Sequence, residues 1–465
     1  MKLPEAFTEY TRTLLGEAVY PEFESALLGE PVTSLRTNPG KPAIDVAASS
    51  VGLSPVPWTS AGYYAAERPT FTFDPLFHAG CYYVQEASSM FVEQVLRRYV
   101  TRPVVMLDLC AAPGGKSTHA RSLLPEGSLL VSNEVMRPRV QVLVENMVKW
   151  GHPDVVVTNN DPADFQPLRH FFDVILTDVP CSGEGMFRKD PVAVSEWSPE
   201  NVTLCRQRQR RILTDIWDSL KPGGIIIYST CTYNIYEDEA NVSWMQETFG
   251  AEPLEVPVSP DWNVTSDLAG TSLPVYRFLP HRTAGEGFFL AALRKPEGEV
   301  EMPVARRERK KDRKAKTPSV PAACRQWLRE PDAWEWTCDD EQVTAVPAVH
   351  RERIALLRQH LRVVSAGVAV GELKGKDCIP LHALAMSTAR SDGFPVCESA
   401  YEQAIAYLRK EALRLPADCP RGYVLVTYRK VPLGWVKNLG NRANNLYPAE
   451  WRIRSGYLPE ERICL

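Results

Sequence analysis

The chain has 465 residues, of which 44% are hydrophobic and 24% are charged, and its formal net charge is −4. This composition is ordinary for a globular protein and excludes a collagen, a disordered chain and a small disulfide-rich protein. At about 100 to 200 residues per domain, the length predicts two to four domains. Because the net charge is slightly negative, any binding of RNA or DNA has to depend on local basic patches.

The cysteines and the hydropathy pattern predict a cytoplasmic protein. The chain has 11 cysteines, an odd number, and none of them forms a CxxC pair. This pattern argues against a disulfide framework and against a zinc ribbon, so we expect a reducing compartment and no metal site. Residues 1–10 lack the apolar core of a signal peptide, and no run of 18 apolar residues indicates a membrane span. The sequence does not indicate an oligomeric state.

Composition divides the chain into five predicted segments. Residues 1–80 combine short helical pieces with many prolines and predict a small N-terminal accessory domain. Residues 81–296 predict a larger α/β domain, which is followed by a basic linker over 297–318, a middle domain over 319–390 and a C-terminal domain over 391–465. The linker contains ARRERKKDRKAK, which is typical of a solvated connection and can at the same time attract RNA.

The α/β domain alternates short apolar runs with amphipathic helices. In the helix expected over Arg137–Trp150, apolar residues recur at i, i+3, i+4, i+7 and i+8. Ser198 and Pro199 begin another helix, which runs toward Leu220 before Pro222-Gly223-Gly224 stops it. This alternation predicts a doubly wound, largely parallel, Rossmann-like sheet. The runs expected to form its strands are Val104–Leu109, Leu129–Asn133, Val155–Asn159, Asp173–Thr177, Ile225–Ser229 and Phe288–Leu293. In the C-terminal domain we expect a helix over Ala400–Leu413 and a strand over Tyr423–Tyr428.

Polar or reactive residues follow five consecutive strands of the predicted sheet. In open parallel sheets, ligands bind outside the carboxyl ends of the strands. A purely structural sheet has no need of such residues at five strand ends, so we expect a functional site there. The residues in question are the loop from Asp108 to Thr118, then Glu134, Asp161, Asp178 with Cys181, and Cys231.

The first of these loops is a tight, glycine-rich turn into a helix. Gly114 and Gly115 let backbone N–H groups approach a ligand, and the helix N-terminus favours an anion. The anion is either a phosphate or the carboxylate of an amino-acid ligand. A phosphate-binding P-loop requires a glycine at position 110, where this chain has Cys110. A nucleotide triphosphatase is therefore only a weak alternative.

The next two strand ends point to a nucleoside cofactor. Glu134 follows the second strand, where an acid can bind ribose hydroxyls. Asp161 follows the third strand and is placed to bind an adenine amino group. A ribose, an adenine and an anionic end, without a P-loop, predict S-adenosyl-L-methionine as the cofactor.

Two cysteines end neighbouring strands and should lie close together. A lone cysteine is usually a small buried hydrophobic residue. Cys181 and Cys231, however, each follow a strand and stand in a polar turn. A thiolate can add to C6 of a pyrimidine and make C5 nucleophilic, which splits one difficult step into two easier ones.

Three segments resemble the signature motifs of the Sun (NSUN) family of RNA cytosine-C5 methyltransferases. They are DLCAAPGGKST (108–118), DVPCSGEGMFRKDP (178–191) and YSTCTYNIYEDEAN (228–241). HAGCYYVQEASSM (78–90) is similar to the family segment before the cofactor loop. GWVKNLGNRANNLYPAEWRIR (434–454) is similar to the end of the RsmF branch, whose last domain is PUA-like and binds RNA. Small departures, QEASSM and the KST end of the loop, touch no predicted catalytic atom.

The resemblance implies a role for each matching residue. Cys231 matches the nucleophile, Cys181 the second cysteine that assists product release, and Asp178 the acid that holds the cytosine ring and also reaches the cofactor. Glu134 matches the ribose ligand and Asp161 the adenine ligand. DNA cytosine-C5 methyltransferases use the other cysteine as nucleophile, so family likeness alone favours Cys231. The cofactor loop is matched by Cys110, Ala111, Ala112, Pro113, Gly114, Gly115 and Lys116.

We therefore expect S-adenosylmethionine-dependent methylation of cytosine C5 in RNA through a covalent cysteine adduct. The RsmF-like C-terminus favours small-subunit (16S) ribosomal RNA or the small ribosomal subunit as the partner. A tRNA substrate and a non-catalytic RNA-binding protein of ribosome assembly are the alternatives.

Three features allow both a functional and a structural interpretation. The segment Gly183–Asp190, with Arg188 and Lys189, is either a mobile lid that contacts RNA phosphate or an ordinary loop. Trp435 either belongs to the core or packs near RNA. For the arginines at 206, 208, 210 and 211 we expect a solvated face for at least two.

Overall fold

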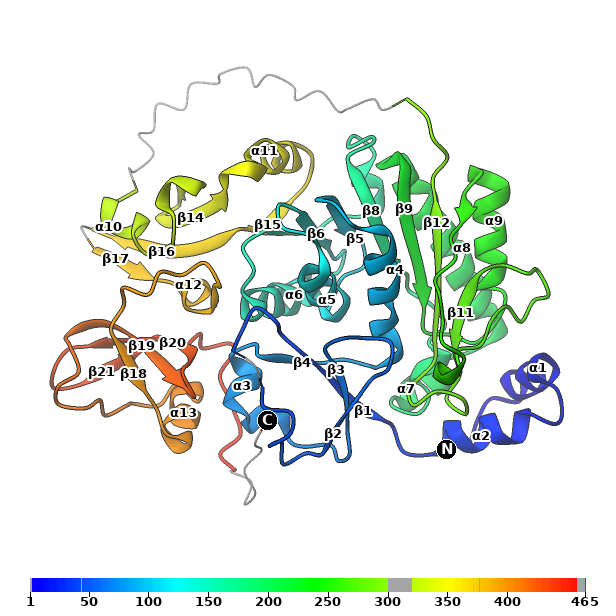
Figure 1. Cartoon of the computed structure of the whole chain (residues 1–465), viewed down its shortest axis with the longest axis horizontal. Coiled ribbons are helices and arrows are strands. Elements are labelled where there is room, and N and C mark those ends of the chain that lie inside the picture. Colours follow the sequence, from blue (N-terminus) through cyan, green and yellow to red (C-terminus); the bar gives the residue numbers. More distant parts are fainter. Residues whose placement is uncertain (1, 43, 300–319, 376, 458–464) are drawn as a thin grey trace.

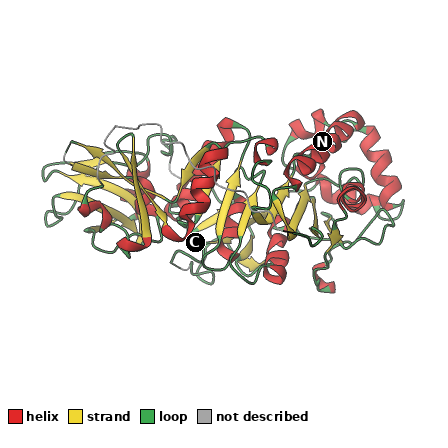
Figure 2. Cartoon of the chain, turned by 90° about the horizontal axis from the view of Figure 1, so that it is seen from above, coloured by secondary structure: helices red, strands yellow, loops and turns green. Residues whose placement is uncertain are grey.

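A computed structural model describes residues 2–42, 44–299, 320–375, 377–457 and 465 (Figure 1). Most of the predicted basic linker, including 305–316, lies outside these residues. Figure 2 shows the N-terminal helices at one end of the molecule and the strands of the C-terminal half at the other. Within the described ranges, no helix is long and apolar enough to span a bilayer.

The N-terminal segment packs directly on the catalytic domain. Phe7 and Phe23 belong to α1 and α2, and their rings lie 5.5 Å from Trp197 and 5.0 Å from Tyr233. A four-stranded sheet of order β2-β3-β1-β4 follows, and α3 and α4 lead into the larger domain. The elements are α1 (Glu5–Leu15), α2 (Tyr20–Leu28), β1 (Thr33–Thr37), β2 (Leu53–Pro55), β3 (Gly62–Ala65), α3 (Pro75–His78), β4 (Tyr82–Val84) and α4 (Val92–Tyr99).

The central sheet confirms the predicted doubly wound fold. Its strand order is β10-β12-β9-β8-β5-β6-β7-β15, and β11 pairs with β12. Strands β7, β6, β5, β8 and β9 are parallel. The chain order therefore reverses at β5, between β6 and β8. The strands are β5 (Val105–Asp108), β6 (Leu129–Asn133), β7 (Val155–Thr158), β8 (Phe172–Asp178), β9 (Leu220–Thr230), β10 (Glu252–Pro253), β11 (Val275–Phe278) and β12 (Phe288–Arg294).

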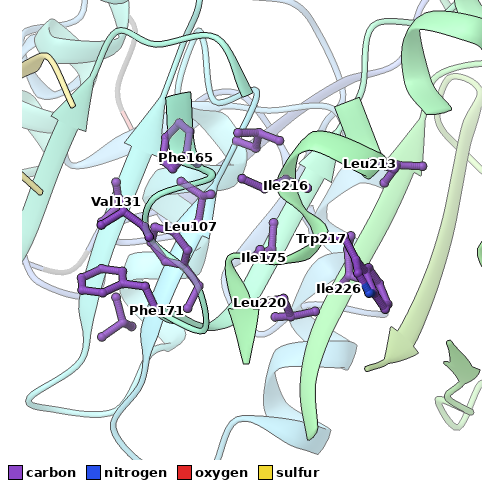
Figure 3. Close-up of a cluster of buried hydrophobic side chains, with 14 of the residues drawn as sticks. Leu107, Val131, Phe165, Phe171, Ile175, Leu213, Ile216, Trp217, Leu220 and Ile226 are labelled. Atoms are coloured by element: carbon purple, nitrogen blue, oxygen red, sulfur yellow. The ribbon is translucent and has the colours of Figure 1, made fainter. Parts of the chain in front are cut away.

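Alternate residues of the parallel strands pack on opposite faces of this sheet. Leu107, Val131 and Ile175 point to one face, where they meet α8 and α9 (Figure 3). Met106 and Leu130 point to the other face, where they meet α4, α5 and α6. This alternation is the two-residue period of a strand that is buried on both sides. The helices are α5 (Gly115–Leu123), α6 (Arg137–Trp150), α7 (Pro191–Glu196), α8 (Pro199–Trp217) and α9 (Glu239–Phe249).

The middle segment contributes a strand to the catalytic sheet. β15 (Val363–Ala366) pairs antiparallel with β7, although the segment was predicted as a separate domain. Leu357, on α11 (Arg351–His360), is fully buried in the same hydrophobic cluster as the strands β5 and β8. The cause is non-local, because the edge of β7 and the apolar face of α11 each need a partner that local periodicity does not identify.

The rest of the chain forms two further four-stranded sheets of order β13-β14-β16-β17 and β18-β19-β20-β21. Trp435, fully buried, donates its indole N–H to the carbonyl oxygen of Leu381 at 2.9 Å, so it belongs to the core and not to an RNA-facing surface. The elements are α10 (Ala322–Arg325), β13 (Trp334–Asp339), β14 (Gln342–Pro347), β16 (Val368–Lys374), β17 (Asp377–Pro380), α12 (His382–Met386), β18 (Val396–Glu398), α13 (Tyr401–Leu408), β19 (Gly422–Tyr428), β20 (Val431–Asn438) and β21 (Ala443–Asn445).

The predicted C-terminal helix extends five residues too far at its C-terminal end. It ends at Leu408 and not at Leu413, because Lys410 adopts a φ of 63° and turns the chain out of the helix. Leu413 instead forms an isolated antiparallel bridge with Ala443. The predicted strand in this domain is observed as β19.

Substitution of Leu357 should destabilise the catalytic domain itself. Leu357→Ala leaves a cavity in the shared core, so we expect the free energy of unfolding to fall by about 2–5 kcal/mol in urea denaturation. Leu204→Ala is the matched control, because Leu204 is 58% exposed and its loss should change stability by less than about 0.5 kcal/mol. A loss below about 1 kcal/mol for Leu357→Ala would mean that α11 is not part of this core.

Candidate active site

A cavity of about 360 Å³ opens at the carboxyl ends of β5 and β8, next to the point where the strand order reverses. This is the position at which open α/β sheets bind ligands. Lys116, Asp178 and Cys231 line the cavity, together with the loop Cys110–Pro113 and Gly115. Three of the five predicted strand ends therefore meet in one cavity.

The loop between β5 and α5 presents free backbone donors. Gly114 adopts a left-handed conformation with φ 116°, and no side chain caps the helix that begins at Gly115. The carbonyl oxygens of Ala112 and Pro113 are already held by Arg139 at 2.6 Å and Asn146 at 2.8 Å. The first residues of α5, Gly115 and Lys116, line the cavity, and no side chain caps the N–H groups at this end of the helix. An uncapped helix N-terminus suits a carboxylate group.

Asp108 adds a buried carboxylate at the base of this loop. Ser117 donates its hydroxyl to Asp108 Oδ2 at 2.6 Å, whereas Oδ1 has no hydrogen-bond partner in the described part of the chain. Burial raises the pKa of Asp108 to about 7. Asp108 is fully buried and does not line the described cavity, so it supports the loop through Ser117, whereas the uncapped N-terminus of α5 beside the cavity suits the carboxylate of an amino-acid ligand such as S-adenosylmethionine.

Two predicted cofactor ligands do not line the cavity. Glu134 is 3% exposed and accepts the backbone N–H of Met136 at 2.8 Å. Asp161 caps the short 3-10 helix Pro162–Phe165 and forms an ion pair with Arg211 at 3.0 Å. The side-chain hydrogen bond from Arg211 holds the pKa of Asp161 below its ordinary value. Their roles toward ribose and adenine stay predictions.

The two cysteines are in contact. Cys181 Sγ lies 3.2 Å from Cys231 Sγ, and both are free thiols. Cys231 lines the cavity. Cys181 contacts Cys231 but does not itself line the described cavity. The hydrogen bond with Cys231, and then burial, raise the pKa of Cys181 well above its ordinary value. The arrangement favours a protonated Cys181 beside a Cys231 that is open to a ligand.

Lys116 and Asp178 form the charged pair of the cavity. Lys116 Nζ lies 2.9 Å from Asp178 Oδ2, and Ser229 donates its hydroxyl to Asp178 Oδ1 at 2.8 Å. Burial disfavours the ammonium group, but attraction to Asp178, and then to Cys231, raises the pKa of Lys116 above its ordinary value. A protonated Lys116 therefore places a positive charge in the cavity that Cys231 also lines.

Two buried glutamates hold the cysteine loops to each other. Glu184, in the loop after Cys181, accepts the backbone N–H groups of Tyr233 and Asn234 at 2.6 and 3.1 Å. Glu237, in the segment after Cys231, accepts the backbone N–H of Ser182 at 3.0 Å. Each carboxylate thus orders the loop of the opposite cysteine, and we call the pair the carboxylate clamp. Both glutamates are fully buried.

The carboxylate clamp is satisfied by further donors. Trp197 donates its indole N–H to Glu184 at 3.0 Å, and Gln209 donates to Glu237 at 2.7 Å. Asn234 Nδ2 donates to both glutamates at 2.9 Å. The N–H of Gly185 also donates to the carbonyl oxygen of Cys231 at 2.9 Å, so the two loops form one rigid unit.

The lid interpretation of Gly183–Asp190 is wrong for Arg188. Its side chain is only 6% exposed and pairs with Glu286 at 2.8 Å. It also donates to the carbonyl oxygens of Gly285 and Ala26 at 2.7 and 3.1 Å. Arg188 therefore ties this loop to the N-terminal segment and is not available to an RNA phosphate.

The arginines of α8 divide as expected. Arg210 donates to Asn241 at 2.9 Å, and Arg211 pairs with Asp161 and Asp215. Arg206 and Arg208 make no ion pair or hydrogen bond within the described ranges, and the second is exposed.

Sequence analysis missed several residues of the site. Glu184 and Glu237 lie inside the quoted motifs, but nothing in their spacing indicates that each reaches the opposite loop. Glu286, from the turn before β12, had no signal at all. The segment 78–90 was noted only for its likeness, and it provides Tyr83 and Gln85 to the cavity wall. No group of metal-ligating side chains is found among the described residues.

Glu237 should give the protein a measurable pH dependence of stability. Burial raises the pKa of this carboxyl from 4.5 to about 6. Because the folded protein favours the protonated form, its stabilising contribution is fully present below pH about 4.5 and is lost as the pH rises through about 6, about 2 kcal/mol in total. In urea unfolding from about pH 4.5 to 7, Glu237→Gln should therefore lose less stability than the unmodified protein.

Glu247→Gln on α9 is the control for this experiment, because Glu247 is exposed. Its stability profile should run parallel to that of the unmodified protein. If the Glu237→Gln profile is parallel as well, then Glu237 does not titrate in this range.

Three family profiles match the chain. A profile of 16S rRNA methyltransferase RsmB/F matches residues 101–294. The N-terminal domain of 16S rRNA methyltransferase RsmF matches residues 3–87, and the methyltransferase RsmF PUA domain matches residues 394–453. These matches confirm the predicted likeness to the RsmF branch and the PUA-like C-terminal domain.

Known proteins agree with the profiles. Ribosomal RNA small subunit methyltransferase F of Aliivibrio fischeri is 31% identical over 479 residues, which cover 98% of each chain. The structure of a methyltransferase homolog protein from Pyrococcus horikoshii is similar with a TM-score of 0.54 and 25% identity, covering 63% of this chain and 95% of that one. NSun6 from Pyrococcus horikoshii with SFG has a TM-score of 0.53 at 21% identity, covering 63% and 99%, and supports the fold alone. The chain therefore belongs to the ribosomal RNA small subunit methyltransferase F (RsmF) family.

Proposed function

We propose that this protein methylates C5 of a cytosine in small-subunit (16S) ribosomal RNA through a covalent adduct between Cys231 and C6 of the base. The observation that carries the proposal is the pair of thiols 3.2 Å apart, one of which lines a cavity that also contains Lys116 and Asp178. The RNA is inferred from the names of relatives that match the full length of the chain. A tRNA cytosine is the second candidate.

Cys231 is the proposed nucleophile. Addition of its thiolate to C6 forms a C–S bond and breaks the C5–C6 double bond, so C5 becomes electron-rich. Lys116 supplies the positive charge that favours the thiolate, and Cys181 keeps its proton under the influence of Cys231 and burial. The target nucleotide must leave its stack so that the ring face can meet the sulfur.

The cofactor of this methyltransferase family is S-adenosylmethionine. When bound, it supplies an electrophilic methyl group and departs as S-adenosylhomocysteine. The loop Cys110–Lys116 and the start of α5 are proposed to hold its amino-acid end, because Gly115 and Lys116, the first residues of a helix without a side-chain cap, line the cavity there.

Asp178 is proposed to hold the cytosine ring. Its carboxylate is fixed by Lys116 and Ser229 and is one-third exposed to the cavity. In this position Asp178 can hold a proton at N3 of the cytosine or accept a hydrogen bond from its N4 amino group while C6 is attacked. After C5 has taken the methyl group, water accepts the C5 proton, the C5–C6 double bond forms again and the C–S bond breaks, so that Cys231 departs as a thiolate. The adjacent Cys181 assists this release.

Covalent trapping tests the proposal. Cys181→Ala protein is incubated with unmodified small-subunit rRNA and S-adenosylmethionine and is then run on a denaturing gel. We expect a protein–RNA adduct that accumulates because product release is slow, and sequencing of the trapped RNA identifies the nucleotide. The double variant Cys181→Ala/Cys231→Ala should give no adduct. Trapping of tRNA in place of rRNA would assign the second candidate.

Cys205→Ala is the matched control, because Cys205 is a buried thiol of α8 that does not line the described cavity. This variant should turn over normally without accumulating an adduct. If the adduct persists without Cys231, or if neither RNA is trapped or methylated, the proposed mechanism is wrong.

Removal of the charge on Asp178 should reduce turnover more than binding. Asp178→Asn keeps the shape of the side chain but loses the anion that fixes Lys116 and holds the base, so we expect kcat to fall by about 10²- to 10⁴-fold. The measurement is steady-state transfer of labelled methyl groups to RNA. Asp215→Asn, which loses a carboxylate of α8 paired with Arg211, should leave kcat nearly unchanged. Activity of Asp178→Asn within about threefold of the unmodified protein would exclude the assigned role.

A further inference from the structure

A second cavity of about 360 Å³ borders the segment that follows Cys231. Its walls come from three parts of the chain: α1, the start of α8, and the residues Asn234 and Tyr236. Cys231, Asp178 and Lys116 line the other cavity and not this one. A ligand in the second cavity is therefore not the base that reacts, but it contacts the segment that carries the nucleophile.

Three aromatic side chains form this second cavity, which we call the aromatic cavity. The rings of Tyr10 and Tyr236 lie 5.5 Å apart with an angle of 33° between their planes. Tyr236 is 46% exposed, so its ring is accessible to a ligand in the cavity. Trp197 is buried and fixed by its hydrogen bond to Glu184. Aromatic faces of this kind stack on unpaired bases of single-stranded RNA.

Arg206 supplies a positive charge at the rim. It lines the aromatic cavity and makes no ion pair or hydrogen bond in the described part of the chain. Arg210 lies one turn further along α8, and burial, followed by the charge of Arg206, lowers its pKa. An uncompensated guanidinium group beside aromatic rings fits the phosphate of a nucleotide whose base occupies the cavity.

We infer that the aromatic cavity binds a second, unstacked nucleobase of the substrate RNA, with Arg206 on its phosphate. This inference rests on the proposed function. The five residue steps from Cys231 to Tyr236 can span at most about 18 Å, so the base is a near neighbour of the target cytosine in the RNA. The pocket volume lies within the usual range of about 300–1,000 Å³ for ligand sites.

The aromatic cavity is connected to the parts that order the nucleophile. Tyr10 accepts the backbone N–H of Ile235 at 2.9 Å, and Trp197 donates to Glu184 of the carboxylate clamp. A base that stacks on the exposed ring of Tyr236 therefore restrains the segment between Cys231 and Tyr236 from its outer side. The protein therefore recognises its RNA at the aromatic cavity as well as at the target cytosine.

The first test is the Michaelis constant for RNA. Tyr236→Ala removes the exposed stacking face, so we expect KM for small-subunit rRNA to rise by about 5- to 150-fold, whereas KM for S-adenosylmethionine stays unchanged. Tyr236→Phe keeps the ring and should restore RNA binding to within about threefold. Arg206→Ala should raise KM and weaken its dependence on salt, whereas Arg208→Ala on the same helix serves as the matched control.

The second test uses the RNA itself. Abasic nucleotides are placed one at a time on both sides of the target in the RNA that the unmodified protein methylates. One position should raise KM for the unmodified protein, and the same RNA should cause no further rise for Tyr236→Ala, because both changes remove one stacking contact.

The inference is overturned if Tyr236→Ala and Arg206→Ala leave KM for RNA within twofold of the unmodified protein, or if no abasic position distinguishes the unmodified protein from Tyr236→Ala. The aromatic cavity would then serve another ligand, such as a peptide of a partner protein. These outcomes differ from a failure of the proposed function, in which the unmodified protein itself would neither methylate nor trap RNA. The thermal unfolding midpoint of each variant is compared with that of the unmodified protein, as a control that the fold is kept.

Discussion

The carboxylate clamp is the interaction on which the geometry of the site depends. Burial of two glutamates is costly unless every oxygen accepts hydrogen bonds, and here both accept several, from backbone N–H groups of the opposite loop and from surrounding side chains. A side chain without charge would form weaker bonds to these N–H groups, and an apolar one would leave them buried without an acceptor. The clamp therefore holds the loops that follow Cys181 and Cys231 at a fixed distance. That distance sets the contact between the two sulfur atoms.

Strand register brings the two turns together before the clamp acts. Asp178 is paired directly with Ser229 across β8 and β9, so Cys181 and Cys231 leave the sheet at the same level. The same register allows Ser229 to fix Asp178, which in turn orients Lys116 toward the cavity. A shift by two residues would keep the side chains on their faces of the sheet but would separate these partners. The chemistry of the site is thus encoded first in the pairing of two buried strands.

These relations explain which parts of the structure could be predicted from sequence. The strands and their order of polar ends follow from local periodicity and from the general rule for parallel sheets, so the meeting of Lys116, Asp178 and Cys231 was predictable. The role of Arg188 was left open, because glycines beside basic residues look alike in a lid and in a loop that is held by a buried ion pair. The pairing of β15 with β7 and the crossing of Glu184 to Tyr233 depend on contacts between distant segments, about which local periodicity says nothing. The positions of Glu134 and Asp161 after their strands did not indicate whether their side chains line the cavity.

The N-terminal helices are part of the active site and not only an attached domain. Phe7 packs on Trp197, which bonds to Glu184, and Tyr10 accepts the backbone N–H of Ile235 four residues after the nucleophile. Arg188 joins the same helices to the loop of Cys181 by a hydrogen bond to Ala26. Displacement of α1 or α2 would therefore loosen both cysteine loops at once. If RNA binds against these helices as we propose, it orders the segment after Cys231 through hydrogen bonds already present, so that RNA binding is coupled to the position of the proposed nucleophile.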